Sequence, residues 1–400
     1  MAAQNHGALH GVKIVDLSRV LSGPFCTQIL ADHGADVIKV ESPDGDEVRR
    51  WGPPFKHGMA SYFIGVNRNK RSIGVDLSRQ PGRDALVRLL DGADVLLENF
   101  KPGTMEKWGL GYGQLSDRFP SLIYCRISGF GAEGPLGGFP GYDAILQAMC
   151  GLMSVNGDPQ ARGVRLGIPI VDIASGLYTA IAIVMGLVER SRSGLGQFID
   201  MTLYDSALAI LHPYLANYLL SGERPVSTGN AHPNISPYDK FPTRTCEIFL
   251  GIGNDRAFQR LCAELQHPHL AEDERFRSNA DRVRNKQPLR EILENVLSQY
   301  DGHALCRQLL SLGLAAGPVA SVDEAFTHAH TRFRNMAIEE DWYRGVASPV
   351  KFSRSKGVGL VCPPPELGQN GRQILLQHGY SDAEINALVA DGVICGIASS

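Results

Sequence analysis

One aspartate is placed where it could do chemistry. Asp172 lies between a short apolar run, 168–171, and a long apolar stretch rich in small residues, 173–188. The β-branched residues and Pro169 of the first run predict an extended segment, and the second is long enough for a largely buried helix. At a helix start, free N–H groups and the positive dipole end favour an anion. An ordinary N-cap and a carboxylate nucleophile at a pocket edge both fit this position.

Composition limits the classes of function. The 400 residues predict two domains, and a net charge of −3 gives no bulk attraction to nucleic acid or membrane. An anionic ligand must therefore be held by local cations. The eight cysteines are scattered without metal spacing, which favours reduced thiols in a cytoplasmic protein. No signal peptide is recognisable at the start, and the apolar run 177–188 is too short to span a bilayer.

The first part of the chain predicts parallel strands joined by helices. We expect strands at 12–17, 35–40, 94–98 and 122–127, with helices at 25–33 and 82–90. Arg19 follows the first strand and the loop 99–103 follows a later one, which is where such sheets bind ligands. The run 67–76 places three cations just before another strand. A solvated surface and a phosphate-binding segment are both compatible with that run.

The segment Gly129-Phe130-Gly131-Ala132-Glu133-Gly134 matches the spacing of a dinucleotide-binding loop. A long loop rich in proline and glycine follows it, however, where the fingerprint requires a helix. The first strand–helix turn, where that fingerprint belongs, has a different sequence. We therefore exclude NAD binding.

Past Asp172 the chain changes character. We expect a strand at 196–203, a helix at 204–220, a polar linker at 221–245, a small mainly helical domain at 246–330 and a return to the large domain over 331–400. The large domain would then comprise 1–220 together with the final segment.

In order along nearly the whole chain, these segments resemble the class III (CaiB/BaiF) CoA-transferase family. The matching segments are 15–24, 31–41, 67–72, 98–103, 129–131, 141–143, the stretch around Asp172, and 317–319. The resemblance implies an α/β fold with a Rossmann-like large domain built from both chain ends, a smaller mainly helical or α+β domain, and an interlocked homodimer. It implies Asp172 as the nucleophile, coenzyme A or acyl-CoA as a substrate rather than a tightly bound cofactor, and no metal. It implies CoA contacts at Arg19, Val20, Lys70, Arg71, Asn99, Phe100, Lys107 and Tyr142.

Two departures and one loop bear on the substrate. Ser42 stands where some relatives have arginine, and the chain lacks the tetraglycine run of formyl-CoA transferases, which weighs against formate and oxalate. The stretch 229–238 is similar to members that use succinyl-CoA with glutarate, malate, mesaconate or itaconate. Its neutral side chains could orient a second carboxylate, although a purely structural loop is the alternative. The candidates are Asn230, His232, Asn234 and Tyr238.

Two other functions compete with this interpretation. Racemases of 2-methylacyl-CoA in the same superfamily have histidine where this chain has Tyr142, and a phenol is a poor base near neutral pH. The substitution favours the transferase. In a non-catalytic CoA-binding protein, Asp172 would be only a cap, and a CoA-exchange assay separates the two.

Overall fold

The chain forms two compact units in the computed structural model, which describes residues 7–160 and 163–396. The first unit contains the chain up to Cys150, then 167–210, and everything from Arg332 onward. The second contains 151–166 and 211–331. These boundaries differ from the sequence-based ones, because 151–166 and 211–220 belong to the second unit. The expected linker also ends in strand β9 (Tyr238–Pro242) of that unit.

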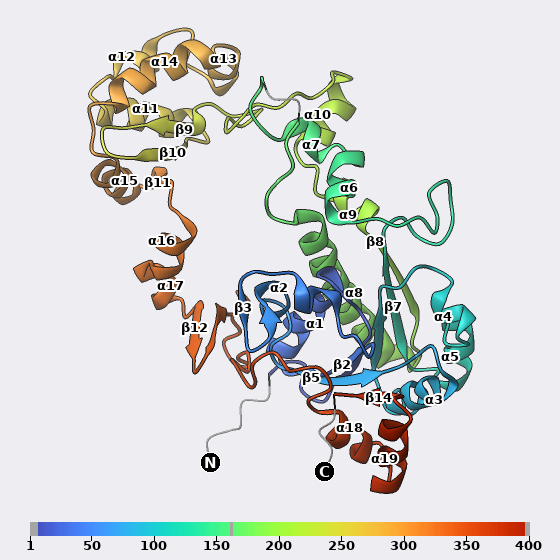
Figure 1. Ribbon diagram of the computed structural model, residues 1–400. Helices are drawn as coiled ribbons and strands as arrows, with labels where there is room; N and C mark the ends of the chain where they lie inside the picture. The colour runs from blue at the N-terminus through green and yellow to red at the C-terminus, as the bar shows by residue number, and fades with distance from the viewer. Residues whose placement is uncertain (1–6, 161–162, 397–400) are drawn as a thin grey trace. The chain divides into compact units, whose positions relative to one another are not determined.

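A seven-stranded sheet organises the first unit (Figure 1). Six of its strands are parallel. The seventh comes from the C-terminal end of the chain and runs antiparallel to its neighbour at one edge of the sheet. Both ends of the sequence therefore contribute to one sheet, as expected for a Rossmann-like domain. In spatial order the strands are β14 (Ile394–Cys395), β5 (Lys70–Val75), β2 (Asp36–Glu41), β1 (Lys13–Asp16), β6 (Val95–Glu98), β7 (Ile123–Ser128) and β8 (Phe198–Thr202).

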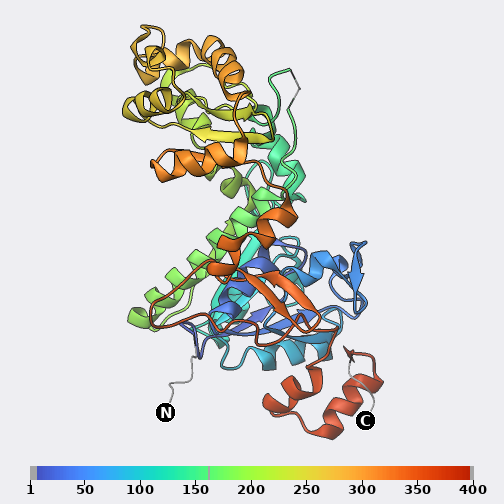
Figure 2. The same ribbon diagram turned by 90° about the vertical axis from the view of Figure 1, so that its left-hand side faces the viewer.

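Helices cover both faces of this sheet. Because side chains alternate along a strand, Val15 of β1 packs into one core and its neighbour Ile14 into the other. The Val15 face packs against α3 (Gln80–Leu89), α4 (Thr104–Lys107), α5 (Tyr112–Arg118), α18 (Gly371–Gln377) and α19 (Asp382–Ala390). The Ile14 face packs against α1 (Ser22–Asp32) and α8 (Ile170–Ser193). Figure 2 shows the red C-terminal helices next to the blue N-terminal part of the unit.

The strand order creates a topological switch point between β1 and β6. From β1 the sheet continues through β2 and β5 on one side, and the later strands β6, β7 and β8 extend it on the other. Loops at the carboxyl ends of β1 and β6 therefore leave in opposite directions and open a crevice, which is where open α/β sheets bind ligands.

Helix α8 is longer than the sequence analysis expected. It begins at Ile170, so only Ile168 and Pro169 of the expected extended run lie outside it. Its length and composition would suffice to cross a membrane, with a mean hydropathy of 1.9, but it packs as a core helix on α1 and the sheet. Gly176 permits a close approach to α1, since a Cβ there would lie 2.7 Å from the Ser22 carbonyl oxygen.

Shorter elements complete the first unit. The segment 131–142 contains no helix, in agreement with the exclusion of a dinucleotide-binding turn. The remaining elements are the 3-10 helix η1 (Glu47–Arg50), α2 (Ser61–Ile64), α6 (Asp143–Met149), α9 (Leu203–Ala209), and the hairpins β3 (Phe55–Lys56)–β4 (Met59–Ala60) and β12 (Ala337–Glu340)–β13 (Tyr343–Val346).

The second unit has a three-stranded antiparallel sheet and its own apolar core. The expected helix 204–220 is two helices, because Pro213 cannot continue the first and precedes the second. Its strands are β9, β10 (Glu247–Gly251) and β11 (Ala315–Pro318), and its helices are α7 (Leu152–Val155), α10 (Tyr214–Ser221), α11 (Asp255–Glu264), α12 (His269–Glu272), α13 (Asn279–Arg284), α14 (Lys286–Leu297), α15 (Gly302–Ser311) and α16 (Val322–Thr327). Helix α17 (Ala329–Phe333) spans the return to the first unit.

Candidate active site

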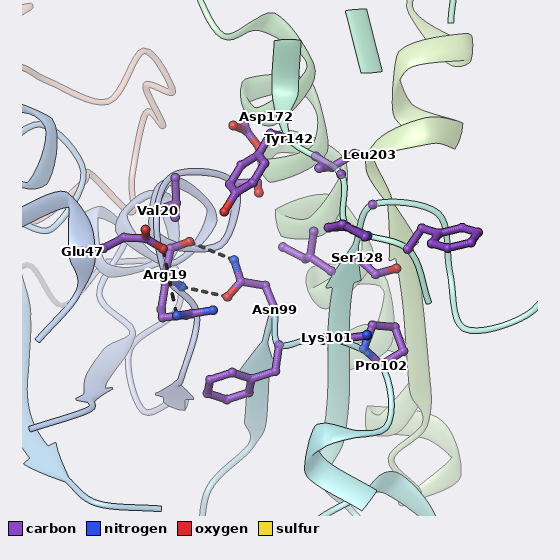
Figure 3. A pocket seen from close by; sticks show the side chains of 17 residues that line it. Arg19, Val20, Glu47, Asn99, Lys101, Pro102, Ser128, Tyr142, Asp172 and Leu203 are labelled. Atoms are coloured by element: carbon purple, nitrogen blue, oxygen red, sulfur yellow. Dashed lines mark hydrogen bonds and ion pairs between the residues drawn. The ribbon is translucent and has the colours of Figure 1, made fainter. Parts of the chain in front are cut away.

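A pocket opens in the first unit at the carboxyl ends of β1, β6 and β7, beside the switch point (Figure 3). Its walls come from the loop between β1 and α1, the loop after β6, the end of β7 and the segment before α6. The N-terminal turn of α8 contributes Asp172. The lining residues are Arg19, Val20, Ser22, Glu47, Asn99, Phe100, Lys101, Pro102, Ile127, Ser128, Gly129, Phe139, Pro140, Gly141, Tyr142, Asp172 and Leu203.

Asp172 is the third residue of α8 and is not its cap. The position before the helix is Pro169, whose side chain makes no capping hydrogen bond. Instead, the Val171 N–H donates to Asp143 Oδ1 at 2.8 Å, and the Asp172 N–H donates to the same oxygen at 3.3 Å. Asp143 is held in turn by Gln147 Nε2, 2.7 Å from its Oδ2. Because Asp143 satisfies the helix terminus, the Asp172 carboxylate is left to face the pocket.

The environment of Asp172 disfavours its charged form. Only 9% of the residue is exposed. Burial and, to a smaller extent, the nearby charge of Asp143 raise the pKa of its carboxyl to about 6, against the opposing effect of a hydrogen bond from the Ser22 side chain. A carboxyl with this pKa is mostly ionised at pH 7 and more basic than an ordinary aspartate. Perturbed carboxyls of this kind concentrate at functional sites.

The loop after β1 is tied to the loop after β6. The Arg19 N–H donates to Asn99 Oδ1 at 2.9 Å, and Asn99 Nδ2 donates back to the Arg19 carbonyl at 2.8 Å. The Arg19 guanidinium carbon lies 5.5 Å from the centre of the Phe100 ring, and 47% of the side chain is exposed. In Figure 3 the Arg19–Asn99 pair lies below Asp172 and Tyr142 on the lining of the same pocket. A cation therefore faces the same pocket as the buried carboxylate.

Three expected contact residues do not line this pocket. The Lys70 ammonium is buried and donates to the Pro24 carbonyl at 2.8 Å and to Asn67 Oδ1 at 2.9 Å. Arg71 forms an ion pair with Asp36. Both residues begin β5, so they lie at the amino ends of the parallel strands, whereas the pocket is at the carboxyl ends. Lys107, at the end of α4, is exposed outside the lining.

The polar loop 229–238 lies in the second unit and is partly built into it. The Asn234 N–H donates to His232 Nδ1 at 3.0 Å, the His232 ring packs edge-on against Tyr238, and Asn234 exchanges side-chain hydrogen bonds with Asn217. Asn230 is exposed. Burial lowers the pKa of His232, as do the charges of Lys286 and His212. The loop therefore presents a neutral imidazole whose hydrogen is on Nε2.

Sequence reasoning missed four residues around the carboxylate. Ser22 and Lys101 line the pocket from the two loops that had been singled out, so their loop positions were the available signal. Asp143 stood in the Gly-Tyr-Asp segment but had no assigned role. Half-buried Tyr62 keeps its proton, because burial and the charges of Asp172 and Asp143 raise its pKa to about 12. No local sequence pattern indicates that Tyr62 lies near Asp172.

The site suits chemistry at a carboxylate. Within residues 7–160 and 163–396, no three His, Cys, Asp or Glu side chains gather as a metal site would require. The arrangement offers one partly desolvated nucleophile, hydroxyl groups near it and cations along the same pocket. These are the parts needed to attack an acyl group carried by an anionic molecule.

Comparisons with known proteins show the family to which the chain belongs. A model of the family described as CoA-transferase family III matches residues 9–371. Succinate–glutarate CoA-transferase of Agrobacterium fabrum is 40% identical over 381 residues, covering 92% of this chain and 95% of that protein. Acetyl-CoA:oxalate CoA-transferase of Acetobacter aceti is 37% identical over 384 residues, covering 96% and 98%. The crystal structure of a CaiB/BaiF family protein from Brucella suis has 41% identity and a TM-score of 0.84, covering 94% of this chain and 100% of that one.

The Asp143 charge predicts the pH dependence of any reaction in which Asp172 is the nucleophile. In the wild type, kcat/KM should fall below about pH 6 as Asp172 is protonated. Asp143→Asn keeps an oxygen for the Val171 and Asp172 N–H groups but removes the charge, so the pKa of Asp172 falls. The acid limb should move down by about one pH unit in a rate profile measured from pH 4.5 to 8. A limb that stays in place or moves up would contradict this assignment.

Proposed function

Because the chain belongs to CoA-transferase family III, we propose that it moves CoA from succinyl-CoA to a C4–C5 dicarboxylate through a covalent intermediate on Asp172. The observation that carries the proposal is the buried Asp172 carboxylate, with a pKa of about 6, facing a pocket that also contains Arg19 and Lys101. Glutarate is the first candidate acceptor, and itaconate, mesaconate and malate are the others.

In the proposed reaction, an Asp172 oxygen attacks the thioester carbonyl of the donor. The C–S bond breaks, leaving a mixed anhydride and the CoA thiolate. The thiolate attacks the aspartyl carbonyl carbon, the C–O bond breaks, and the donor acid departs as its carboxylate while Asp172 holds CoA as a thioester. The acceptor carboxylate then attacks this thioester, and the same steps in reverse deliver CoA to the acceptor. No net proton or electron is exchanged.

The position of Asp172 suits both halves of this cycle. Attack requires the ionised carboxylate, and a pKa of about 6 leaves it ionised at pH 7. Burial limits the water that could hydrolyse the anhydride or thioester. The short first turn of α8 sits against α1, so the carboxylate is on a rigid element rather than on a loop.

We place CoA along the pocket and an adjoining hollow that shares Arg19 and Phe100 with it. Arg19 and Lys101 would contact the phosphates. The aromatic rings of Phe100 and Trp108, which pack edge-on 5.5 Å apart, would contact the nucleotide. Ser42 lines the adjoining hollow, so the departure from relatives that have arginine lies within the proposed nucleotide site.

The acceptor assignment rests on the loop 229–238 and on the relatives. The glutarate relative, at 40% identity, favours a longer diacid, and the oxalate relative, at 37%, makes the shortest diacid its natural competitor. A neutral His232 with its hydrogen on Nε2 supplies a donor for the carboxylate that does not react.

We also propose that the active form is a homodimer in the cytoplasm. Residues one and two turns apart on α8 leave an apolar strip exposed, which a second copy would cover. The strip consists of Leu177, Ile181, Val184, Met185 and Val188, with exposures from 39% to 65%.

The same pocket does not favour racemisation. Moving an α-proton needs an acid and a base on opposite sides of the substrate carbon. Asp172 could serve as one of them, but Tyr142 stands where the related racemases have histidine, and 57% of it is exposed. The transferase chemistry needs Asp172 alone as the reacting group.

Asp172→Asn should abolish transfer while stabilising the protein at neutral pH. An amide cannot form the anhydride, so activity should fall at least about 10³-fold. The raised pKa means that ionising Asp172 costs the folded state free energy, about 3 kcal/mol at most for a rise from 3.8 to about 6. This cost is full above pH 6 and disappears below pH 4, so the variant should melt higher than wild type at pH 8 and similarly at pH 4.

Calorimetric melting and a CoA-exchange assay measure the two effects of Asp172→Asn. The exposed Asp91→Asn should change neither the melting temperature nor the activity. Wild-type turnover, with deamidation excluded by mass spectrometry, would overturn the role of Asp172.

Arg19→Ala should raise the KM for succinyl-CoA by about 10-fold or more, because a charge-assisted contact to phosphate is lost. The acceptor preference should stay the same. Arg71→Ala is the matched control, since Arg71 pairs with Asp36 at the opposite end of the strands and its loss should leave this KM unchanged. Equal effects of the two changes in initial-rate kinetics would refute the CoA placement.

His232→Ala tests the acceptor. We expect kcat/KM for glutarate to fall about 10-fold or more, and that for butyrate to fall less than about threefold, because only the diacid has a second carboxylate to lose a hydrogen bond. His269→Ala, an exposed histidine of the same unit, is the control. Equal losses for the two acids would make the loop structural. A wild type that prefers oxalate to glutarate in the same panel would overturn the C4–C5 assignment.

A further inference from the structure

A pair of opposite charges is completely buried beneath the pocket. Lys39 of β2 and Asp46, just before η1, have no exposed side-chain surface, and Lys39 Nζ lies 3.0 Å from Asp46 Oδ2. Burying two charges is expensive, and an apolar pair of the same volume often serves stability as well. Stability alone therefore does not account for this buried pair, and its contacts to neighbouring residues indicate another role.

Those contacts hold the loop after β1 on both sides of Arg19. Lys39 Nζ donates to the Ser18 carbonyl at 2.9 Å. Asp46 Oδ1 accepts from the Val20 N–H at 3.3 Å. The residues immediately before and after Arg19 are thus fixed by one ion pair, while the Arg19 backbone is held from the other side by Asn99.

Val20 is strained in this position. Its φ is +68°, in the left-handed region that β-branched residues rarely adopt. Such a conformation persists only where its surroundings enforce it, and the hydrogen bond to Asp46 is the contact that holds the Val20 N–H. The reversal at Val20 lets Arg19 face the pocket and starts α1 so that Ser22 reaches Asp172.

We propose that the Lys39–Asp46 pair is a positioning device, which sets the loop 18–22 so that Arg19 meets CoA and Ser22 meets the nucleophile. The proposal rests on the proposed placement of CoA. Lys39 lines neither hollow, and Asp46 borders the adjoining one without exposed side-chain surface, so both side chains act through the loop.

The charges around the pair allow its effect on the loop to be separated from its effect on the stability of the protein. The buried cluster is balanced, with three carboxylates and three cations, so removing one member leaves an excess charge and removing both restores the balance. The carboxylates are Asp16, Glu41 and Asp46, and the cations are Lys39, Arg49 and Lys70.

The experiment compares Lys39→Met, Asp46→Ala, which removes both the ion pair and the acceptor of the Val20 N–H, and the double variant with wild type. We measure the dissociation constant for CoA by calorimetry, the melting temperature, and kcat and KM for succinyl-CoA with glutarate. Arg68→Met is the control, because it breaks a buried pair with Asp32 in the same unit without touching the loop 18–22.

We expect each single change to weaken CoA binding and lower kcat/KM by about 10-fold or more. The control should lose melting temperature but keep the wild-type affinity for CoA. The double variant should regain melting temperature over the single variants while its affinity for CoA stays low. Adding Val20→Gly to Asp46→Ala should recover part of the affinity, since glycine adopts a positive φ without the hydrogen bond to Asp46.

Unchanged CoA affinity in the folded Asp46→Ala and double variants would overturn the proposal, as would an equal loss in Arg68→Met. CoA binding is measured directly and does not depend on transfer. A wild type that binds CoA without transferring it would refute the proposed reaction, and the affinities of the variants would still test the role of the pair. If Lys39→Met does not fold, the other two variants give the same comparison.

Discussion

The N-terminal turn of α8 is held by a carboxylate from another helix, and the site depends on that interaction. Asp143 accepts hydrogen bonds from the N–H groups of Val171 and Asp172. The side chain of the N-cap residue ordinarily accepts such bonds. Asp172 is therefore free to face the pocket rather than fold back on its own backbone. The same arrangement puts two carboxylates close together in a poorly hydrated place, which raises the pKa of Asp172 to about 6. One contact thus fixes the position of the candidate nucleophile and adds to the effect of burial on its basicity.

The sheet topology supplies the rest of the site. A switch point between β1 and β6 makes the loops after these strands diverge, and the reciprocal hydrogen bonds between Arg19 and Asn99 bridge them. Helix α8 approaches this crevice because Gly176 lets it pack closely on the start of α1. The Arg19 cation and the buried Asp172 carboxylate lie 153 residues apart in the sequence, yet both face one pocket. That combination is what a reaction between an anionic thioester and a carboxylate requires.

Much of the fold could be predicted from local patterns. The strands and helices expected up to Ile127 are all present to within a few residues, because parallel strands buried on both faces are short apolar runs separated by helix-forming segments. The short helices and the hairpin between them were not expected. The misplaced elements are those decided by contacts. The expected strand before Asp172 is partly the first turn of α8, which Asp143 caps from outside, and the expected helix 204–220 is interrupted at Pro213.

The sequence by itself determined the α/β architecture and the family resemblance, and it singled out Asp172 as a candidate, since these depend on residue type, periodicity and ordered motifs. Only the tertiary structure decided which cations reach the pocket. All four are basic, but Lys70 and Arg71 begin β5, whereas Arg19 and Lys101 follow the carboxyl ends of β1 and β6. Arg71 therefore pairs with Asp36 at the amino ends of the strands. The buried Lys70 ammonium forms an ion pair with Asp16, whereas the Arg19 side chain stays exposed. A charge run shows that cations are present, and the direction of its strand determines what they face.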